Sequence, residues 1–177
     1  FGADSEPVKS GRVATVQGLG GTGGLKIGAD FLRHLLPNAK VLISDPSWEN
    51  HRALFTQAGF TVETYAYYDA AQRGVNFEGM LASLQAAPAG TVVLLHACCH
   101  NPTGYDLTSA QWDQVIAVIQ ARGLTPFLDM AYQGFGEGIA EDGAVVGKFV
   151  ASGLTFLVST SFSKSFSLYG ERVGALS

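Results

Sequence analysis

The sequence contains few of the residues that build a disulfide framework. It has only two cysteines in 177 residues, Cys98 and Cys99, and these are adjacent. Neighbours in sequence are poorly placed for the geometry of a disulfide bond, so this pair does not suggest a cross-linked secreted fold. The cysteine content instead favours a reducing, cytoplasmic location.

Charged residues and long apolar runs are also scarce. Only 15% of the residues are charged, and the formal net charge is −4. A chain without an excess of basic residues has little to attract a nucleic-acid backbone or an anionic membrane. No apolar run approaches the length that spans a bilayer. We therefore expect neither nucleic acid nor membrane as a partner.

The composition that remains is that of a well-buried globular domain. Hydrophobic residues make up 47% of the chain, which is long enough to enclose one sizeable core. No repeat or linker divides it, so we expect a single domain over residues 1–177. The chain opens on Phe1, and residues 173–177 are still strand-like. We therefore expect an internal fragment of a longer protein.

Short apolar runs alternate with helical patterns along the whole chain. The predicted strands are 13–17, 41–44, 61–67, 91–97, 125–130, 155–161 and 173–177. The predicted helices are 25–36, 49–58, 77–84, 109–122 and 144–151. Thr108 and Gln111 form a capping box before the fourth helix, and Gly123 ends it. This alternation predicts an α/β fold of three layers, with a mostly parallel sheet between helices on both faces.

In such sheets, ligands bind beyond the carboxyl ends of the strands. The first predicted strand is followed by residues 18–24, which are Gly-Leu-Gly-Gly-Thr-Gly-Gly. Glycines let the backbone approach a ligand, and a helix that starts there directs free N–H groups at it. We therefore expect a phosphate at this loop, with Thr22 as an additional hydroxyl donor.

The same loop permits a second reading. Gly18, Gly20 and Gly23 match the G-x-G-x-x-G pattern of dinucleotide-binding folds, and Asp45 stands at the end of the next strand, where such folds carry an acidic residue. A dinucleotide-binding domain is therefore an alternative, although it does not account for the polar residues further along the chain.

Polar residues also follow three later strands. Asn101 lies just after the strand 91–97, close to His96 and His100, and Asp129 lies inside the apolar strand 125–130. A carboxylate buried there needs a cation or strong donors as partners. The histidines and the two cysteines are too tightly spaced for one tetrahedral zinc site, so we predict no metal.

The last polar group contains a lysine. Lys164 follows the strand 155–161 in a serine-rich setting, and Arg172 comes eight residues later. A lysine amine that is shielded from water readily becomes a nucleophile.

These features together resemble the class I aminotransferases, specifically the branch that acts on aspartate and aromatic amino acids. The matching stretches are Gly20-Gly21-Thr22-Gly23, Asp45-Pro46-Ser47-Trp48-Glu49-Asn50-His51, His100-Asn101-Pro102-Thr103-Gly104, Asp129-Met130-Ala131-Tyr132-Gln133-Gly134-Phe135, Ser161-Phe162-Ser163-Lys164 and Tyr169-Gly170-Glu171-Arg172-Val173-Gly174. The resemblance spans nearly the whole chain, and it implies pyridoxal 5'-phosphate as the cofactor.

The resemblance also implies roles for the residues in these stretches. Lys164 holds the cofactor as a Schiff base and shuttles the proton. Asp129 pairs with the pyridine nitrogen, His51 supports Asp129 from behind, and His96 and His100 extend that network.

Other residues are implied to bind the rest of the cofactor. Trp48 stacks on the ring, while Asn101 and Tyr132 bind the phenolic oxygen. Trp48 and Asn101 also contact the substrate. The residues implied to hold the phosphate are Gly21, Thr22, Ser161 and Arg172.

By this resemblance, the activity is ping-pong transamination between an aromatic amino acid or aspartate and a 2-oxo acid such as 2-oxoglutarate. The stretches 96–100 and 126–129 read nearer to the aromatic branch. The family acts as a homodimer with a C-terminal small domain, and we expect that domain and an N-terminal segment to lie outside this chain. An effector domain of a transcription regulator, which resembles these enzymes, is a further alternative.

Overall fold

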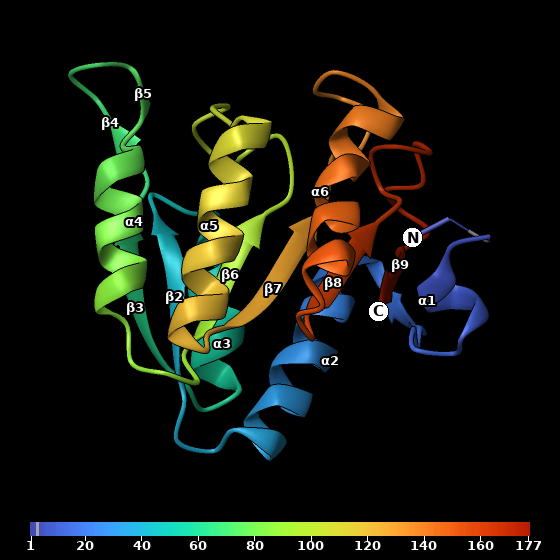
Figure 1. Cartoon of the computed structure of the whole chain (residues 1–177). Coiled ribbons are helices and arrows are strands. Elements are labelled where there is room, and N and C mark those ends of the chain that lie inside the picture. Colours follow the sequence, from blue (N-terminus) through green and yellow to red (C-terminus); the bar gives the residue numbers. More distant parts are fainter. Residues whose placement is uncertain (3) are drawn as a thin grey trace.

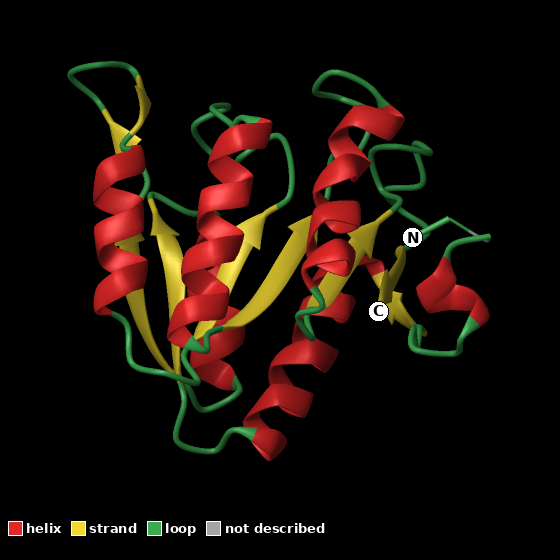
Figure 2. Cartoon of the chain, in the orientation of Figure 1, coloured by secondary structure: helices red, strands yellow, loops and turns green. Residues whose placement is uncertain are grey.

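The computed structural model describes residues 1–2 and 4–177, and these form an α/β fold with a central sheet (Figures 1 and 2). The strands are β1 (Val16–Leu19), β2 (Lys40–Asp45), β3 (Thr61–Ala66), β4 (Tyr68–Asp69), β5 (Gly74–Val75), β6 (Val92–His96), β7 (Thr125–Met130), β8 (Leu157–Ser161) and β9 (Val173–Leu176). The helices are α1 (Glu6–Lys9), α2 (Gly20–Leu35), α3 (Glu49–Gln57), α4 (Phe77–Ala86), α5 (Ser109–Arg122) and α6 (Ile139–Ser152).

Seven strands make up the main sheet, in the order β1-β9-β8-β7-β6-β2-β3. Only β9 runs against the others, because it pairs antiparallel with both β1 and β8. The predicted, mostly parallel sheet is therefore confirmed. The carboxyl ends of β1, β2, β6, β7 and β8 consequently lie along one edge of the sheet, where the theory of such folds places ligands.

Helices cover both faces of this sheet, as predicted. Helices α4, α5 and α6 lie on one face, and α2 and α3 lie on the other (Figure 1). A hydrophobic core lies on each face of the sheet, and alternate residues of the central strands contribute to one core or the other. Leu42 and Val93 face α4, α5 and α6, while Val41 and Val92 face α2 and α3. This alternation is why the central strands read as continuous apolar runs in the sequence.

The capping box predicted before the fourth helix is present at the start of α5. The Thr108 side chain accepts a hydrogen bond from the backbone N–H of Gln111, and the Gln111 side chain accepts one from the N–H of Thr108. Gly123 ends the helix in the left-handed conformation (φ 62°), which suits glycine. The local signals at both ends of this helix were therefore sufficient to place it.

The glycine stretch was predicted wrongly in one respect. We expected residues 18–24 to form a loop, but α2 already begins at Gly20. The glycines are required by close packing: a Cβ atom on Gly21 would lie 2.9 Å from Cβ of Ser161, and one on Gly24 would lie 2.6 Å from Oγ of Ser159. The first turn of the helix therefore sits directly against β8.

Other elements also differ from the prediction, and the largest shift of a boundary among them is at α6. Helix α6 starts at Ile139, five residues before the expected start at residue 144. The buried side chain of Asp142 explains the difference, because its carboxylate accepts hydrogen bonds from the backbone of Gly134, Gly136 and Glu137 and so fixes the loop before the helix. The short hairpin β4–β5 was not predicted at all.

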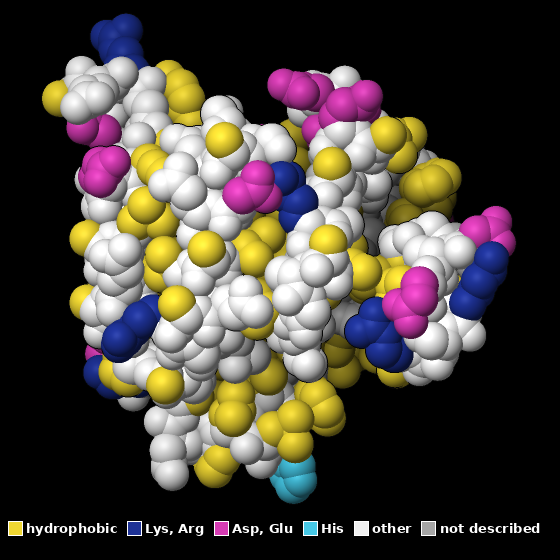
Figure 3. Space-filling view, viewed as in Figure 1, with side chains coloured by type: hydrophobic (Ala, Val, Ile, Leu, Met, Phe, Trp, Pro, Cys, Tyr) yellow, Lys and Arg dark blue, Asp and Glu magenta, His cyan; other side chains and the backbone are white. Residues whose placement is uncertain are grey.

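The outer surface of the helices α4, α5 and α6 carries charges of both signs. Acidic and basic side chains lie scattered among neutral and apolar ones on this face (Figure 3). One such pair joins Lys148 of α6 to Asp113 of α5, with 2.6 Å between Nζ and Oδ1. In the described part of the chain, no helix is both long and apolar enough to cross a membrane.

Candidate active site

A cavity of about 300 Å³ opens at the carboxyl ends of the strands. Polar residues from six separate segments of the chain face it, and the residues that line it are Gly21, Thr22, Leu25, Trp48, His96, Asn101, Asp129, Ala131, Tyr132, Ser161, Ser163, Lys164, Tyr169 and Arg172. All nine residues that the sequence analysis assigned to a cofactor are in this set. The structure therefore brings residues up to 151 positions apart (172 minus 21) into one site.

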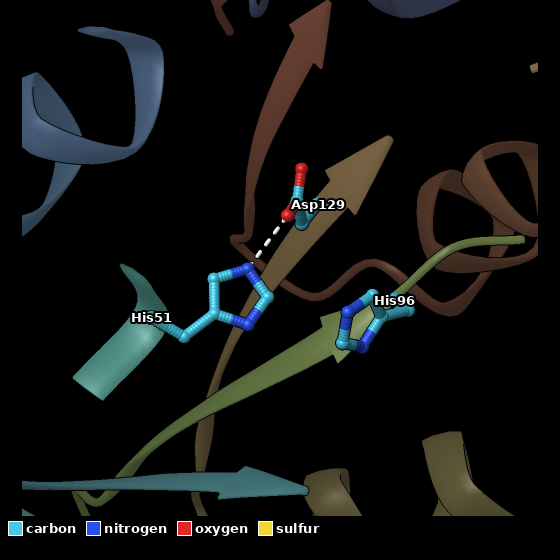
Figure 4. Close-up of side chains that lie close together, drawn as sticks. All are labelled: His51, His96 and Asp129. Carbon is cyan, nitrogen blue, oxygen red and sulfur yellow. Dashed lines mark hydrogen bonds and ion pairs between the residues drawn. The ribbon is translucent and has the colours of Figure 1, made fainter. Parts of the chain in front are cut away.

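Asp129 lies at the bottom of this cavity on β7 and is almost fully buried. Its Oδ2 atom is 2.7 Å from Nε2 of His51, which reaches over from α3 (Figure 4). An ionised carboxylate has no proton to donate and can only accept hydrogen bonds, so Nε2 of His51 is the donor. The Oγ atom of Ser47 lies 2.9 Å from Nδ1 of the same ring and fixes its other side. This arrangement suits a carboxylate that stays charged while buried.

Two more histidines stand beside this pair. The ring of His96 is 4.9 Å from that of His51 and 4.3 Å from that of His100. Burial, followed by the nearby charges of His51 and His100, holds the pKa of His96 well below its ordinary value. Burial also lowers the pKa of His100 to about 4, with His51 as the second cause. Both rings are therefore neutral at neutral pH.

His100 is fully bonded, whereas His96 is not. Atom Nε2 of His100 is 2.9 Å from Oγ of Ser44, and Nδ1 is 2.8 Å from Oγ1 of Thr103. Both ring nitrogens of His96 are buried and have no hydrogen-bond partner among the described residues. Because an unpaired buried polar atom is costly, His96 marks a position at which a bound group with a donor or acceptor would be stabilised.

The opposite end of the cavity is suited to an anion. The N-terminus of α2 opens there at Gly20 and Gly21, beside Ser161 and the guanidinium group of Arg172. Atom Nη1 of Arg172 lies 3.4 Å from Oγ of Ser163, and a Cβ atom on Gly20 would lie 2.6 Å from Nη2. Backbone N–H groups at a helix N-terminus together with an arginine form a phosphate-binding arrangement.

Lys164 lines the same cavity. Its Nζ atom lies 4.8 Å from the centre of the Tyr132 ring and 5.5 Å from that of Tyr169. No carboxylate lies within 4.0 Å of this amine in residues 1–2 and 4–177. The amine is therefore not held in an ion pair with a carboxylate of these residues, and it lies where a nucleophile could meet a carbonyl group bound in the cavity.

The model of the family "Aminotransferase class I and II" matches residues 1–177, which is the whole chain. The chain belongs to this family.

Close relatives carry the names of both branches of the predicted resemblance. The chain is 66% identical to the aspartate aminotransferase of Pseudomonas aeruginosa and 59% identical to the aromatic-amino-acid aminotransferase of Escherichia coli, over 177 residues in each case. These alignments cover all of this chain but only 44% and 45% of the two relatives. The chain therefore spans less than half the length of these curated relatives.

A solved structure has nearly the same backbone. The aromatic-amino-acid aminotransferase of Burkholderia pseudomallei, covalently bound to pyridoxal phosphate, superposes with a TM-score of 0.98 at 67% identity. The match covers 99% of this chain and 44% of that one. The predicted family and fold are thus confirmed over the length of this chain.

The structure adds four residues to the cavity that the sequence analysis did not assign: Leu25, Ala131, Ser163 and Tyr169. Ser163 and Tyr169 lie within the motifs that flank Lys164 and Arg172, so proximity to those residues was the available signal. In contrast, His51 and His100 do not line the cavity, and they reach it only through Asp129 and His96.

The dinucleotide alternative does not fit this geometry. Asp45 is exposed and faces a different cavity, together with Ser47 and Arg52, instead of the site described above. Gly18 is needed for packing, since a Cβ atom on it would lie 2.7 Å from the backbone nitrogen of Gly24. The family match covers the same glycines, so this alternative is rejected.

Three further side chains converge outside the cavity. Ligand atoms of Cys98, Cys99 and Asp142 lie within 4.8 Å of one another. The carboxylate of Asp142 already accepts backbone hydrogen bonds from the loop before α6. Burial raises the pKa of both thiols, which disfavours the thiolate form that binds metals. This cluster is therefore a structural feature of the loop.

Proposed function

We propose that this chain is most of the large, cofactor-binding domain of an aminotransferase, with residues 1–177 forming that single domain. The reaction is transfer of an amino group between an aromatic amino acid or aspartate and a 2-oxo acid such as 2-oxoglutarate. One observation carries the proposal: Lys164, Asp129 and the phosphate-binding end of the cavity all face the same space of about 300 Å³.

The residues of the cavity fit pyridoxal 5'-phosphate. The glycines of α2 leave no room for side chains beside Ser161 and Arg172, so backbone N–H groups line the phosphate end. The unpaired nitrogens of His96 lie at the other end, near Asp129. When bound, this cofactor supplies a ring that accepts the electrons released when a bond at the substrate Cα breaks.

Each residue then has a distinct task. Lys164 would hold the cofactor covalently, and its amine would serve as the group that moves the proton at the substrate Cα. Asp129 would pair with the ring nitrogen of the cofactor, and His51 would orient that carboxylate through their hydrogen bond of 2.7 Å. Proton transfer by a positioned side chain typically contributes a factor of roughly 10²–10⁴ to the rate.

The remaining residues hold the cofactor and the substrate. Trp48 stacks on the cofactor ring, and Asn101 and Tyr132 bind its phenolic oxygen; Trp48 and Asn101 also face the substrate. The phosphate is held by Gly21, Thr22, Ser161 and Arg172. His96 faces the cavity beside Asp129, and His100 supports its ring from the other side.

A titration with pyridoxal phosphate tests the proposal. Wild-type protein should develop the absorbance of the lysine-linked cofactor, and borohydride reduction followed by peptide mass spectrometry should locate the modification on Lys164. Lys164→Ala should abolish both signals. Lys148→Ala is the matched control, because Lys148 pairs with Asp113 on the outer surface. Modification that persists in Lys164→Ala would disprove the assignment.

The identity of the substrate and the assembly belong to the proposal as well. Relatives bear the names of aspartate, aromatic-amino-acid and tyrosine aminotransferases, and we favour an aromatic amino acid. Kinetics of the full-length protein with tyrosine, phenylalanine and aspartate will test this choice, and a clear preference for aspartate would overturn it. We further propose a homodimer in the cytoplasm, which gel filtration with light scattering and cell fractionation can test.

A further inference from the structure

Tyr169 forms an exposed wall of the cavity. It lies in the segment between β8 and β9 that also carries Lys164 and Arg172, and it lines the cavity although 67% of its surface is exposed. A tyrosine exposed to this degree contributes little to a hydrophobic core. Within this chain, the ring instead faces the cations that line the cavity.

The ring of Tyr169 faces both cations of the site. Its centre lies 5.5 Å from Nζ of Lys164 and 5.7 Å from Cζ of Arg172. Both separations are within the range of about 6 Å over which the face of an aromatic ring attracts a cation. Neither cation has a carboxylate within 4.0 Å among the described residues. Lys164 has a second and nearer ring in Tyr132, at 4.8 Å, whereas Tyr169 is the ring found over Arg172 in this part of the chain.

The backbone of Tyr169 also fixes the guanidinium group. Atom Nη1 of Arg172 donates a hydrogen bond to the carbonyl oxygen of Tyr169 at 2.9 Å. On the other side of the arginine, Nη2 lies against the open face of Gly20, where a Cβ atom would come within 2.6 Å of it. The guanidinium group is thus held between Tyr169 and the N-terminus of α2.

The backbone conformation of Arg172 indicates that this arrangement is maintained by its neighbours. Arg172 has a φ of 55°, in the left-handed region that residues other than glycine rarely adopt. Its carbonyl oxygen accepts a hydrogen bond from the N–H of Gly20 at 2.7 Å. Such conformations persist where surrounding contacts enforce them, and they cluster at binding sites.

We propose that Tyr169 is a positioning residue that keeps the guanidinium group of Arg172 directed at the phosphate of the cofactor. The ring face does this, and the hydroxyl group is not needed, since no hydrogen bond of that hydroxyl is found in the described part of the chain. This inference rests on the proposed function, because it requires the cofactor phosphate to bind beside Arg172.

The binding of two ligands distinguishes the positioning of Arg172 from a general effect of Tyr169 on the cavity. Pyridoxal phosphate uses both Lys164 and Arg172, whereas pyridoxal lacks the phosphate and uses only Lys164. Loss of a contact between an exposed ring and a cation changes affinity roughly two- to five-fold. Because the ring also faces Lys164, Tyr169→Leu should weaken the binding of both ligands, but that of pyridoxal phosphate by roughly two- to five-fold more than that of pyridoxal.

Equilibrium absorbance titrations of both ligands make the test, with circular dichroism to verify that each variant is folded. Tyr169→Phe keeps the ring and should bind both ligands like wild type. Phe166→Leu is the matched control, because Phe166 is equally exposed in the same segment but does not line the cavity. An equal loss for both ligands in Tyr169→Leu, or a loss in Tyr169→Phe as large as in Tyr169→Leu, would overturn the inference. A wild-type protein that fails to bind pyridoxal phosphate on Lys164 would instead refute the proposed function itself.

Discussion

The imidazole of His51 donates a hydrogen bond to the carboxylate of Asp129 across 2.7 Å, although the two residues are 78 positions apart in the sequence. One side chain comes from helix α3 and the other from the central strand β7. Both are almost completely shielded from water. The bond therefore joins a helix on one face of the sheet to the charged group at the bottom of the cavity, and it compensates that group for the loss of hydration.

Removal of this partner should destabilise the fold. In His51→Leu, the Asp129 carboxylate stays buried without its donor, and breaking a buried charged pair in this way costs about 3–5 kcal/mol. Urea denaturation monitored by circular dichroism measures the loss. His34→Leu is the control, because His34 is exposed on α2 and should change stability by no more than about 0.5 kcal/mol. Equal losses of unfolding free energy in His51→Leu and His34→Leu would show that the bond between His51 and Asp129 does not stabilise the fold.

Local signals were sufficient to predict most of the fold. The strand 125–130 was predicted with the bounds that β7 has, because its apolar run is flanked by clear stop signals. The capping box at Thr108 likewise placed α5. Signals of this kind depend on neighbours in sequence, so they fail where distant residues decide. The helical start at Gly20 is such a case, since it depends on packing against β8 and β9.

The site was predictable for a related reason. Parallel strands end at one edge of the sheet, so residues that follow strands, such as Asn101 and Lys164, could be expected to meet. Tyr169 was missed because it lies in an irregular segment where no period in the sequence indicates which side chains face inward. The contact between His51 and Asp129 was expected from the family resemblance alone, because no local pattern links residues 78 positions apart; in the structure α3 places the two side chains 2.7 Å apart.

The glycines of α2 provide a second test of close packing. A Cβ atom on Gly24 would lie 2.6 Å from Oγ of Ser159 and 2.9 Å from the carbonyl oxygen of Ala175, so Gly24→Ala should reduce the free energy of unfolding by about 1–3 kcal/mol. Gly147 is exposed in the middle of α6 with no atom within 4 Å of the added group. Gly147→Ala should therefore stabilise the protein by about 0.5–1 kcal/mol. Chemical denaturation of the two variants compares the effects, and the same sign for both would contradict the packing argument.

The capping box predicts a third effect on stability. Thr108→Ala removes the acceptor for the N–H of Gln111 at the start of α5, and the loss of such a cap costs about 1 kcal/mol. Thr108→Ser keeps the hydroxyl oxygen and should retain most of that stability. Thermal denaturation of the three proteins measures the difference. If Ser and Ala at this position lower the melting temperature equally, the hydroxyl group does not act as a cap.

The buried histidines predict that the protein loses stability in mild acid. The folded-state pKa of His100 is about 4, whereas an unfolded histidine titrates near 6.5. Between these values the unfolded chain binds more protons than the folded one, so stability increases with pH across this interval. The contribution of His100 is fully present above about pH 6.5, is lost as the pH falls towards 4, and amounts to at most roughly 3 kcal/mol. The pKa of His96 is lowered as well, so it acts in the same direction.

Urea denaturation at several pH values between about 7 and about 4.5 measures how the free energy of unfolding depends on pH. His100→Gln should flatten the slope of unfolding free energy against pH, because glutamine does not titrate, although it also loses the bonds to Ser44 and Thr103 and so starts from a lower stability. His34→Gln should leave the slope unchanged, since His34 is exposed on α2. An unchanged slope in His100→Gln would mean that His100 is already charged in the folded protein. The neutral state inferred for the histidine cluster behind Asp129 would then be wrong.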